Sequence, residues 1–203
     1  MARKRRPSAA NDVMALPLPD QRRLDSSIKA VFAKCLEKIG FVPNVLRAYT
    51  LRPAKFEPFR LYNNALMLGE SGLSKLEREM IAIVVSCVNH CHYCLIAHGA
   101  AVRAMSGDPE LGEHLITNYR TANLAPRQRT MLDFVWKLTE TPDRMDETDR
   151  ASLRKAGFSD EDIFDIAEVA GFYNMTNRLA SAIDIRPNPD YHAIARTPAA
   201  NNK

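Results

Sequence analysis

Apolar residues recur at helical spacing along most of this 203-residue chain, and Gly or Pro separates one run from the next. The first run extends from Gln21 to Ile39 and stops at Gly40. Val84 and Val85 are β-branched but fall within a helical period, so no strand pattern competes. The sequence therefore predicts an all-α fold, with further helices at about 44–51, 53–68, 74–88, 89–106, 108 onward, 125–138, 148–156 and 159–183.

The length suits one compact domain with a substantial core. We expect a disordered basic arm at 1–18, a helical domain at 19–186 and a loose C-terminal tail at 187–203, because prolines cluster in both end segments. Two long helices open alike 85 residues apart, at Leu73 and at Phe158, which suggests a degenerate internal repeat whose second copy lacks the thiols.

The net charge of +4 comes largely from the first few residues, since four basic side chains lie between Arg3 and Arg6. The rest of the chain is close to neutral, which argues against a nucleic-acid-binding face. No apolar run is long enough to cross a bilayer, and no apolar segment follows the basic N-terminus as in a secretory signal. These features predict a cytoplasmic protein without a membrane partner.

The chemistry of the chain is concentrated in the sequence Cys91-His-Tyr-Cys94, which His98 follows four residues later. On a helix that Asn89 caps, both thiols would share one face, close enough to form a disulfide. His98 shares the face of Cys94 and could accept its proton, and the helix N-terminus would favour a thiolate. Cys91 then stands where a resolving thiol is needed. The pattern indicates redox chemistry.

Glu79 is a carboxylate beside an otherwise apolar helical face, twelve residues before Cys91. Such a group is costly to bury without a partner. If the helices before and after Asn89 pack antiparallel, Glu79 approaches His98 and could orient its imidazole. Glu79 alternatively belongs to a solvated first turn.

Glu79, Cys91, Cys94 and His98 together resemble the active-site signature of AhpD-like alkylhydroperoxidases of the carboxymuconolactone decarboxylase superfamily. The resemblance is greatest to the peroxidase-related branch, covers roughly 20–185, and includes the segments Gly40-Phe-Val-Pro-Asn44, 59–64, 73–103 and 157–163.

This resemblance implies a helical bundle that reduces a peroxide through a dithiol/disulfide cycle and assembles as a homo-oligomer. It implies that Cys94 is the peroxidatic thiol, that Cys91 resolves it, and that Glu79 and His98 relay protons. It also implies a dithiol or protein reductant and no cofactor beyond the cysteine pair. Tyr93 departs from the family, which has His there; its hydroxyl either joins the relay or simply packs.

Three other readings stay open. The dithiol could serve a non-enzymatic redox sensor, which needs the same thiolate. Cys91, Cys94 and His98, with His90 or Glu79, could bind zinc, although no second ligand pair exists elsewhere. A decarboxylase is conceivable within the superfamily, but that branch lacks the dithiol. The spacing of Cys87, Cys91 and Cys94 matches the three-cysteine motif of radical-SAM iron–sulfur proteins, but the sequence does not predict the strands of their barrel. Cys87 is better explained as a core thiol.

Overall fold

A computed structural model describes residues 12–196, and this part of the chain contains helices and no strand. The prediction of a single all-α domain is confirmed. The α-helices are α1 Ser26–Ile39, α2 Asn44–Tyr49, α3 Pro53–Leu68, α4 Lys75–Val88, α5 His92–Ser106, α6 Leu111–Asn118, α7 Pro126–Glu140, α8 Glu147–Lys155 and α9 Asp160–Ala182. The short 3-10 helices are η1 Gln21–Arg23, η2 Tyr119–Thr121, η3 Pro142–Arg144 and η4 Pro189–His192.

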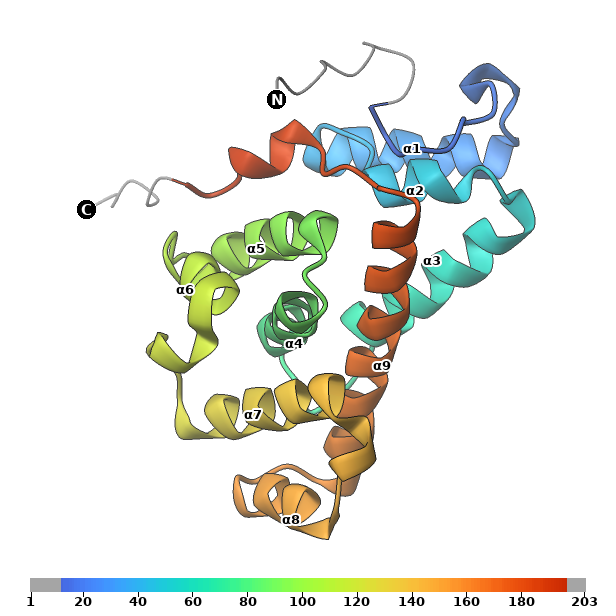
Figure 1. Ribbon diagram of the computed structural model, residues 1–203. Helices are drawn as coiled ribbons and strands as arrows, with labels where there is room; N and C mark the ends of the chain where they lie inside the picture. Colours follow the sequence, from blue (N-terminus) through green and yellow to red (C-terminus); the bar gives the residue numbers. More distant parts are fainter. Residues whose placement is uncertain (1–11, 197–203) are drawn as a thin grey trace, which may run out of the picture.

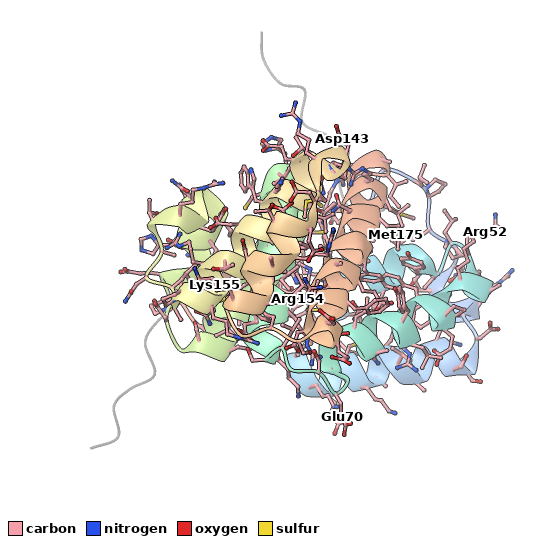
Figure 2. All side chains as sticks on the ribbon, turned by 90° about the horizontal axis from the view of Figure 1, so that it is seen from below. Arg52, Glu70, Asp143, Arg154, Lys155 and Met175 are labelled. Carbon is pink, nitrogen blue, oxygen red and sulfur yellow. The ribbon has the colours of Figure 1, made fainter. Side chains whose placement is uncertain are left out.

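Helix α4 lies at the centre of the fold, with α5, α6, α7 and α9 around it (Figure 1). Its residues from Met80 to Val85 are almost completely buried, which explains why this segment is apolar on every side. Helix α8 covers the outer side of α7 and α9, and Arg154 and Lys155 mark it in the view from below (Figure 2). The central position of α4 places Glu79 at the wall of the site described below.

Local sequence signals set the ends of the helices that carry the site. The Ser74 hydroxyl accepts a hydrogen bond from Glu77 N (3.1 Å), and the Glu77 carboxylate accepts one from Ser74 N (2.8 Å), so α4 opens with a capping box. Ser159 and Asp162 form the same arrangement at α9. Gly107 ends α5 with φ +69°, a conformation that favours glycine.

Several predicted boundaries were wrong. The run from Gln21 to Ile39 is interrupted at Leu24, whose extended backbone separates η1 from α1. Asn89 does not cap α5. It ends α4 instead, and Cys91 occupies the N-cap position of α5 with an extended backbone. The Asp108 carboxylate accepts from the backbone N–H of Leu111, so α6 begins three residues later than predicted.

Both end segments are ordered where the structure describes them, contrary to the expectation of a disordered arm and a loose tail. Val13 and Met14 are buried, and the backbone pairs twice with the C-terminal side: Ala15 N donates to Ile183 O (2.9 Å) and Arg186 N donates to Val13 O (2.8 Å). Their apolar side chains complete the cluster around the thiols. Residues 1–11 and 197–203 of the two predicted segments lie outside the described part.

The suspected internal repeat extends little beyond the shared capping boxes. The chain breaks at His90 and turns back into α5, whereas α9 continues unbroken from Asp160 to Ala182. No α-helix follows α9 within residues 183–196, so α5 has no counterpart there.

Candidate active site

The two thiols lie at a sharp corner between α4 and α5, which pack against each other. His90 makes this corner with a positive φ of +52°, and Cys91 N donates to Ser86 O (3.0 Å) across it. Cys94 follows in the first turn of α5. Free N–H groups at this helix N-terminus favour negative charge on the sulfur atoms.

Cys91 and Cys94 are both buried and reduced, and their side chains are hydrogen-bonded to each other. The hydrogen bond from the Cys94 thiol lowers the pKa of Cys91 to about 6, with smaller contributions from Ser181 and His98. The pKa of Cys94 is raised, because a neighbouring Cys91 thiolate and burial both oppose a second negative charge. The pair therefore loses its first proton easily and holds the second. The sequence predicts that His98 accepts the Cys94 proton, either directly or through water; in the structure the Cys94 thiol contacts the Cys91 sulfur.

Glu79 and His98 meet across the antiparallel pair of helices. His98 Nδ1 lies 2.6 Å from Glu79 Oε2, and the side chains are only 16% and 12% exposed. The carboxylate orients the imidazole by accepting from Nδ1–H, which leaves Nε2 free to accept or deliver a proton. The ring of Tyr173 packs edge-on against His98, with centroids 4.6 Å apart. Glu79 is thus not the solvated residue of the alternative interpretation.

Tyr93 is buried beside the thiols and points toward α2. Its hydroxyl accepts a hydrogen bond from Val45 N (3.2 Å) and is a hydrogen-bond partner of the Tyr191 hydroxyl. Burial raises the pKa of Tyr93, so the phenol stays neutral. The contact ties η4 to α2 and α5.

A cavity of about 290 Å³ reaches the site between α2, α3, α4, α5, α9 and η4. Cys94, His98, Glu79 and Tyr93 line it, whereas Cys91 does not. The rest of the wall is mostly apolar and aromatic, with Val45, Phe59, Met67, Ala97, Phe172 and Ala180 among its residues. A molecule entering the cavity therefore meets Cys94 before Cys91.

Sequence reasoning missed several residues that shape this site. Tyr191 lines the cavity, although it belongs to the C-terminal segment that the sequence predicts to be loose. It lies in a proline-rich stretch beside His192, and no pattern in the sequence distinguishes it. Ser86 and Asn177 are completely buried beside Cys94, and both lower the pKa of its thiol. A polar residue at the core-facing position of an apolar helix was the available signal.

The remaining cysteine on α4 has a structural role. Cys87 Sγ lies 3.3 Å from Ile116 O and 3.4 Å from Leu115 O, where it donates to the end of α6. Burial raises the pKa of this thiol to about 12. Within residues 12–196, no three His, Cys, Asp or Glu side chains converge in a way suited to hold a metal ion.

The chain resembles known proteins over almost its whole length. The model of the carboxymuconolactone decarboxylase family matches residues 53–135. An uncharacterized peroxidase-related protein from Silicibacter sp. TM1040 is 54% identical, with a TM-score of 0.90 over 93% of this chain and 99% of that one. Another, from Ralstonia eutropha JMP134 and described as an alkylhydroperoxidase AhpD core, is 39% identical, with a TM-score of 0.89 over 92% and 98%.

The debrominase Bmp8, solved in complex with 2,3,4-tribromopyrrole, shares the fold at 18% identity, with a TM-score of 0.74 over 87% of this chain and 94% of that one. No curated protein matches. The chain belongs to the AhpD-like, peroxidase-related proteins of the carboxymuconolactone decarboxylase family. Members of this family are enzymes of more than one kind. No helix among the described residues is long and apolar enough to span a membrane.

Proposed function

We propose that this protein reduces peroxides through a dithiol/disulfide cycle of Cys94 and Cys91. One observation carries the proposal: Cys94 is hydrogen-bonded to a second thiol and shares one cavity wall with His98, which Glu79 orients. A nucleophile, a resolving thiol and a proton carrier are thereby all within one site.

In the first step, His98 takes one proton from the thiol pair, and the imidazolium is stabilised by the Glu79 carboxylate. The Cys94 sulfur attacks the terminal peroxide oxygen while its own proton passes to Cys91. The O–O bond breaks, the alkoxide takes the proton of His98 to become an alcohol, and Cys94 becomes a sulfenic acid.

In the second step, Cys91 loses its proton and attacks the Cys94 sulfur. The S–O bond breaks and the departing hydroxide takes up the proton as water, which leaves a disulfide. An external dithiol then supplies two electrons and two protons to restore both thiols. Since Cys94 lines the cavity and Cys91 does not, the reductant attacks Cys94. The cycle uses no cofactor beyond the cysteine pair.

The apolar and aromatic wall of the cavity favours an organic hydroperoxide over hydrogen peroxide, because burying an alkyl or aryl group there gains binding free energy. We assign Tyr93 the role of positioning the η4 segment over this cavity. A reducing compartment regenerates the thiols, so we place the protein in the cytoplasm.

We also propose that the protein is a homo-oligomer, as the family resemblance implied. Large apolar side chains stay exposed on neighbouring helices: Leu61, Tyr62, Leu68, Phe164 and Met175. Light scattering at micromolar concentration should give a mass above that of one 22.8 kDa chain. A monomer at that concentration would contradict this assignment.

Trapping the intermediate tests the cycle. In Cys91→Ser, a stoichiometric dose of cumene hydroperoxide should leave a sulfenic acid at Cys94 that a dimedone reagent labels, whereas the wild type should lose two hydrogens and form a disulfide. Cys94→Ser should consume almost no peroxide. Labelling at Cys91 in Cys94→Ser at the same rate would exchange the two roles. A disulfide that forms without turnover by any dithiol reductant would instead favour the redox sensor.

A further inference from the structure

Two fully buried polar side chains from different helices converge on the Cys94 sulfur. Ser86 comes from α4 and Asn177 from α9, both are 0% exposed, and both lie beside Cys94, where each favours the negative form of the sulfur by lowering the pKa of the thiol. Asn177 Nδ2 also donates to Ser86 Oγ (3.1 Å), so the two groups contact each other beneath the thiol. A hydroxyl and an amide in the core cost free energy unless each hydrogen bond is made.

Asn177 is held in one orientation by its neighbours. Asn89 Nδ2 donates to Asn177 Oδ1 (3.1 Å) and to Asn174 Oδ1 (3.0 Å), which fixes the amide oxygen on the side away from Ser86. The amide nitrogen therefore faces Ser86 and Cys94. With one N–H on Ser86, its second N–H is free for the sulfur.

Ser86 has a hydroxyl that can change partner. In the structure it donates to Ala82 O (2.6 Å), the usual bond of a serine to the preceding turn. Rotation of the hydroxyl about its Cβ–Oγ bond redirects the same proton to Cys94 when the sulfur is negative. The backbone of Ser86 is fixed at this place, because its carbonyl accepts from Cys91 N.

We propose that Ser86 and Asn177 are catalytic donors that stabilise negative charge on the Cys94 sulfur during attack on the peroxide. This inference rests on the proposed function for its step, but the donor site itself concerns only the thiol. The pair of thiols explains how the first proton leaves. Cys91 ionises more easily than Cys94, yet it is Cys94 that lines the cavity. The two donors explain how negative charge can develop on the Cys94 sulfur.

The test measures the ionisation of Cys94 without peroxide. In a Cys91→Ser background, the rate of iodoacetamide alkylation at Cys94 is followed against pH, with the site read by mass spectrometry. Ser86→Ala should raise the apparent pKa of Cys94 by about one unit, the amount that a hydrogen bond to a charged group contributes. Asn177→Ala should act in the same direction. In the otherwise wild-type protein, Ser86→Ala should slow peroxide reduction at pH 7 about ten-fold.

Thr139→Val is the matched control. Thr139 is also buried and its hydroxyl also donates to the preceding turn, at Val135 O (2.8 Å); it accepts from Asn174 Nδ2 (3.3 Å), so its hydrogen bonds go to the backbone and to an amide but not to a thiol. It should leave the pKa of Cys94 unchanged. Circular dichroism shows whether each variant is folded. If Asn177→Ala does not fold, the pKa of Cys94 in Ser86→Ala alone decides the test.

An unchanged pKa in Ser86→Ala overturns the inference, and so does an equal rise in Thr139→Val. If the pKa rises in Ser86→Ala while the wild type reduces no peroxide, the donor site stands and the proposed function fails. If peroxide turnover is normal and the pKa does not move, the proposed function stands and the donors are structural.

Discussion

At the scale of single residues, the contact between Glu79 and His98 does most to define the chemistry. The two residues are nineteen apart in the sequence, yet their side chains meet at 2.6 Å in a mostly buried position. A carboxylate there fixes the tautomer and the orientation of the imidazole. Both groups are therefore expected to act as one unit.

We predict that His98→Ala slows peroxide reduction substantially, within the range of about 100- to 10,000-fold that general acid–base catalysis contributes. Glu79→Gln should lose less, because it acts through His98. The double variant should be little slower than His98→Ala alone. Stopped-flow measurement of peroxide consumption gives the three rate constants.

His114→Ala provides the control, since this histidine is exposed on α6 and should leave the rate unchanged. Additive losses in the double variant would show that Glu79 and His98 act separately. Wild-type rates in both single variants would remove the proton relay and leave only the dithiol.

The pH dependence of the thiol pair provides a second residue-scale prediction. The hydrogen bond from Cys94 lowers the pKa of Cys91 to about 6, so both thiols are protonated well below this pH and one thiolate is present above it. The rate of peroxide reduction should therefore rise as the pH increases through about 6 and then level off. In Cys94→Ala the thiol donor is absent, so the apparent pKa of Cys91, followed by alkylation, should increase. An unchanged pKa there would contradict the shared proton.

At the scale of elements, the break between α4 and α5 creates the site. His90 adopts a positive φ and reverses the chain, which brings the N-terminus of α5 beside the last turn of α4. Cys91 thus occupies the N-cap position of α5, and Cys94 follows in the first turn. A continuous helix, like α9, would have carried Glu79 and His98 far apart along one axis.

The capping box of α4 should contribute measurably to stability, because it satisfies backbone N–H groups at the start of the central helix. We predict that Ser74→Ala lowers the free energy of unfolding by about 1 kcal/mol. Urea denaturation monitored by circular dichroism measures the change. Ser152→Ala, on the exposed side of α8, should stay close to the wild type. Equal midpoints for Ser74→Ala and the wild type would show that packing alone sets this helix end.

At the scale of the whole molecule, the two end segments pack around the thiols, and Tyr191 of the C-terminal segment also lines the cavity. Val13, Met14 and Ile185 pack in the same buried cluster as Cys91 and Cys94. Arg103, only 3% exposed, holds the C-terminal segment by donating to Tyr191 O and Ile194 O, each at 3.0 Å. Access to Cys91 therefore depends on this cover.

We predict that Arg103→Met loosens the C-terminal cover, because two charge-assisted hydrogen bonds are lost. Alkylation of Cys91 should become about ten-fold faster or more, and limited proteolysis should cut earlier near Tyr191. Arg150→Met, a substitution on the outer helix α8, should change neither measurement. If Cys91 reacts at the same rate in Arg103→Met as in the wild type, the reagent reaches it by the cavity instead.

Local signals along the chain are sufficient to predict the helical elements, because caps and apolar periodicity act over a few residues. The stop at Gly40 and the predicted helix starts at about 53 and 74 each agree with a helix end in the structure. The pairing of Glu79 with His98 also followed, since two helices joined by a short turn have few ways to pack except antiparallel. The sequence did not predict that α5 has its N-cap at Cys91, because the backbone angles of a single residue at a helix break depend on its tertiary contacts.

The residues that enclose the thiols come from segments far apart in the chain, so local signals do not predict them. Asn177 lies 91 residues from the Ser86 that it contacts, and the segments around Val13 and Ile183 pair across most of the chain. Their neighbours in the sequence give no sign of these partners, because contacts at such separation arise from the packing of the whole core. The same packing leaves Cys94 on the cavity wall and Cys91 behind it, a difference that two cysteines three residues apart do not reveal.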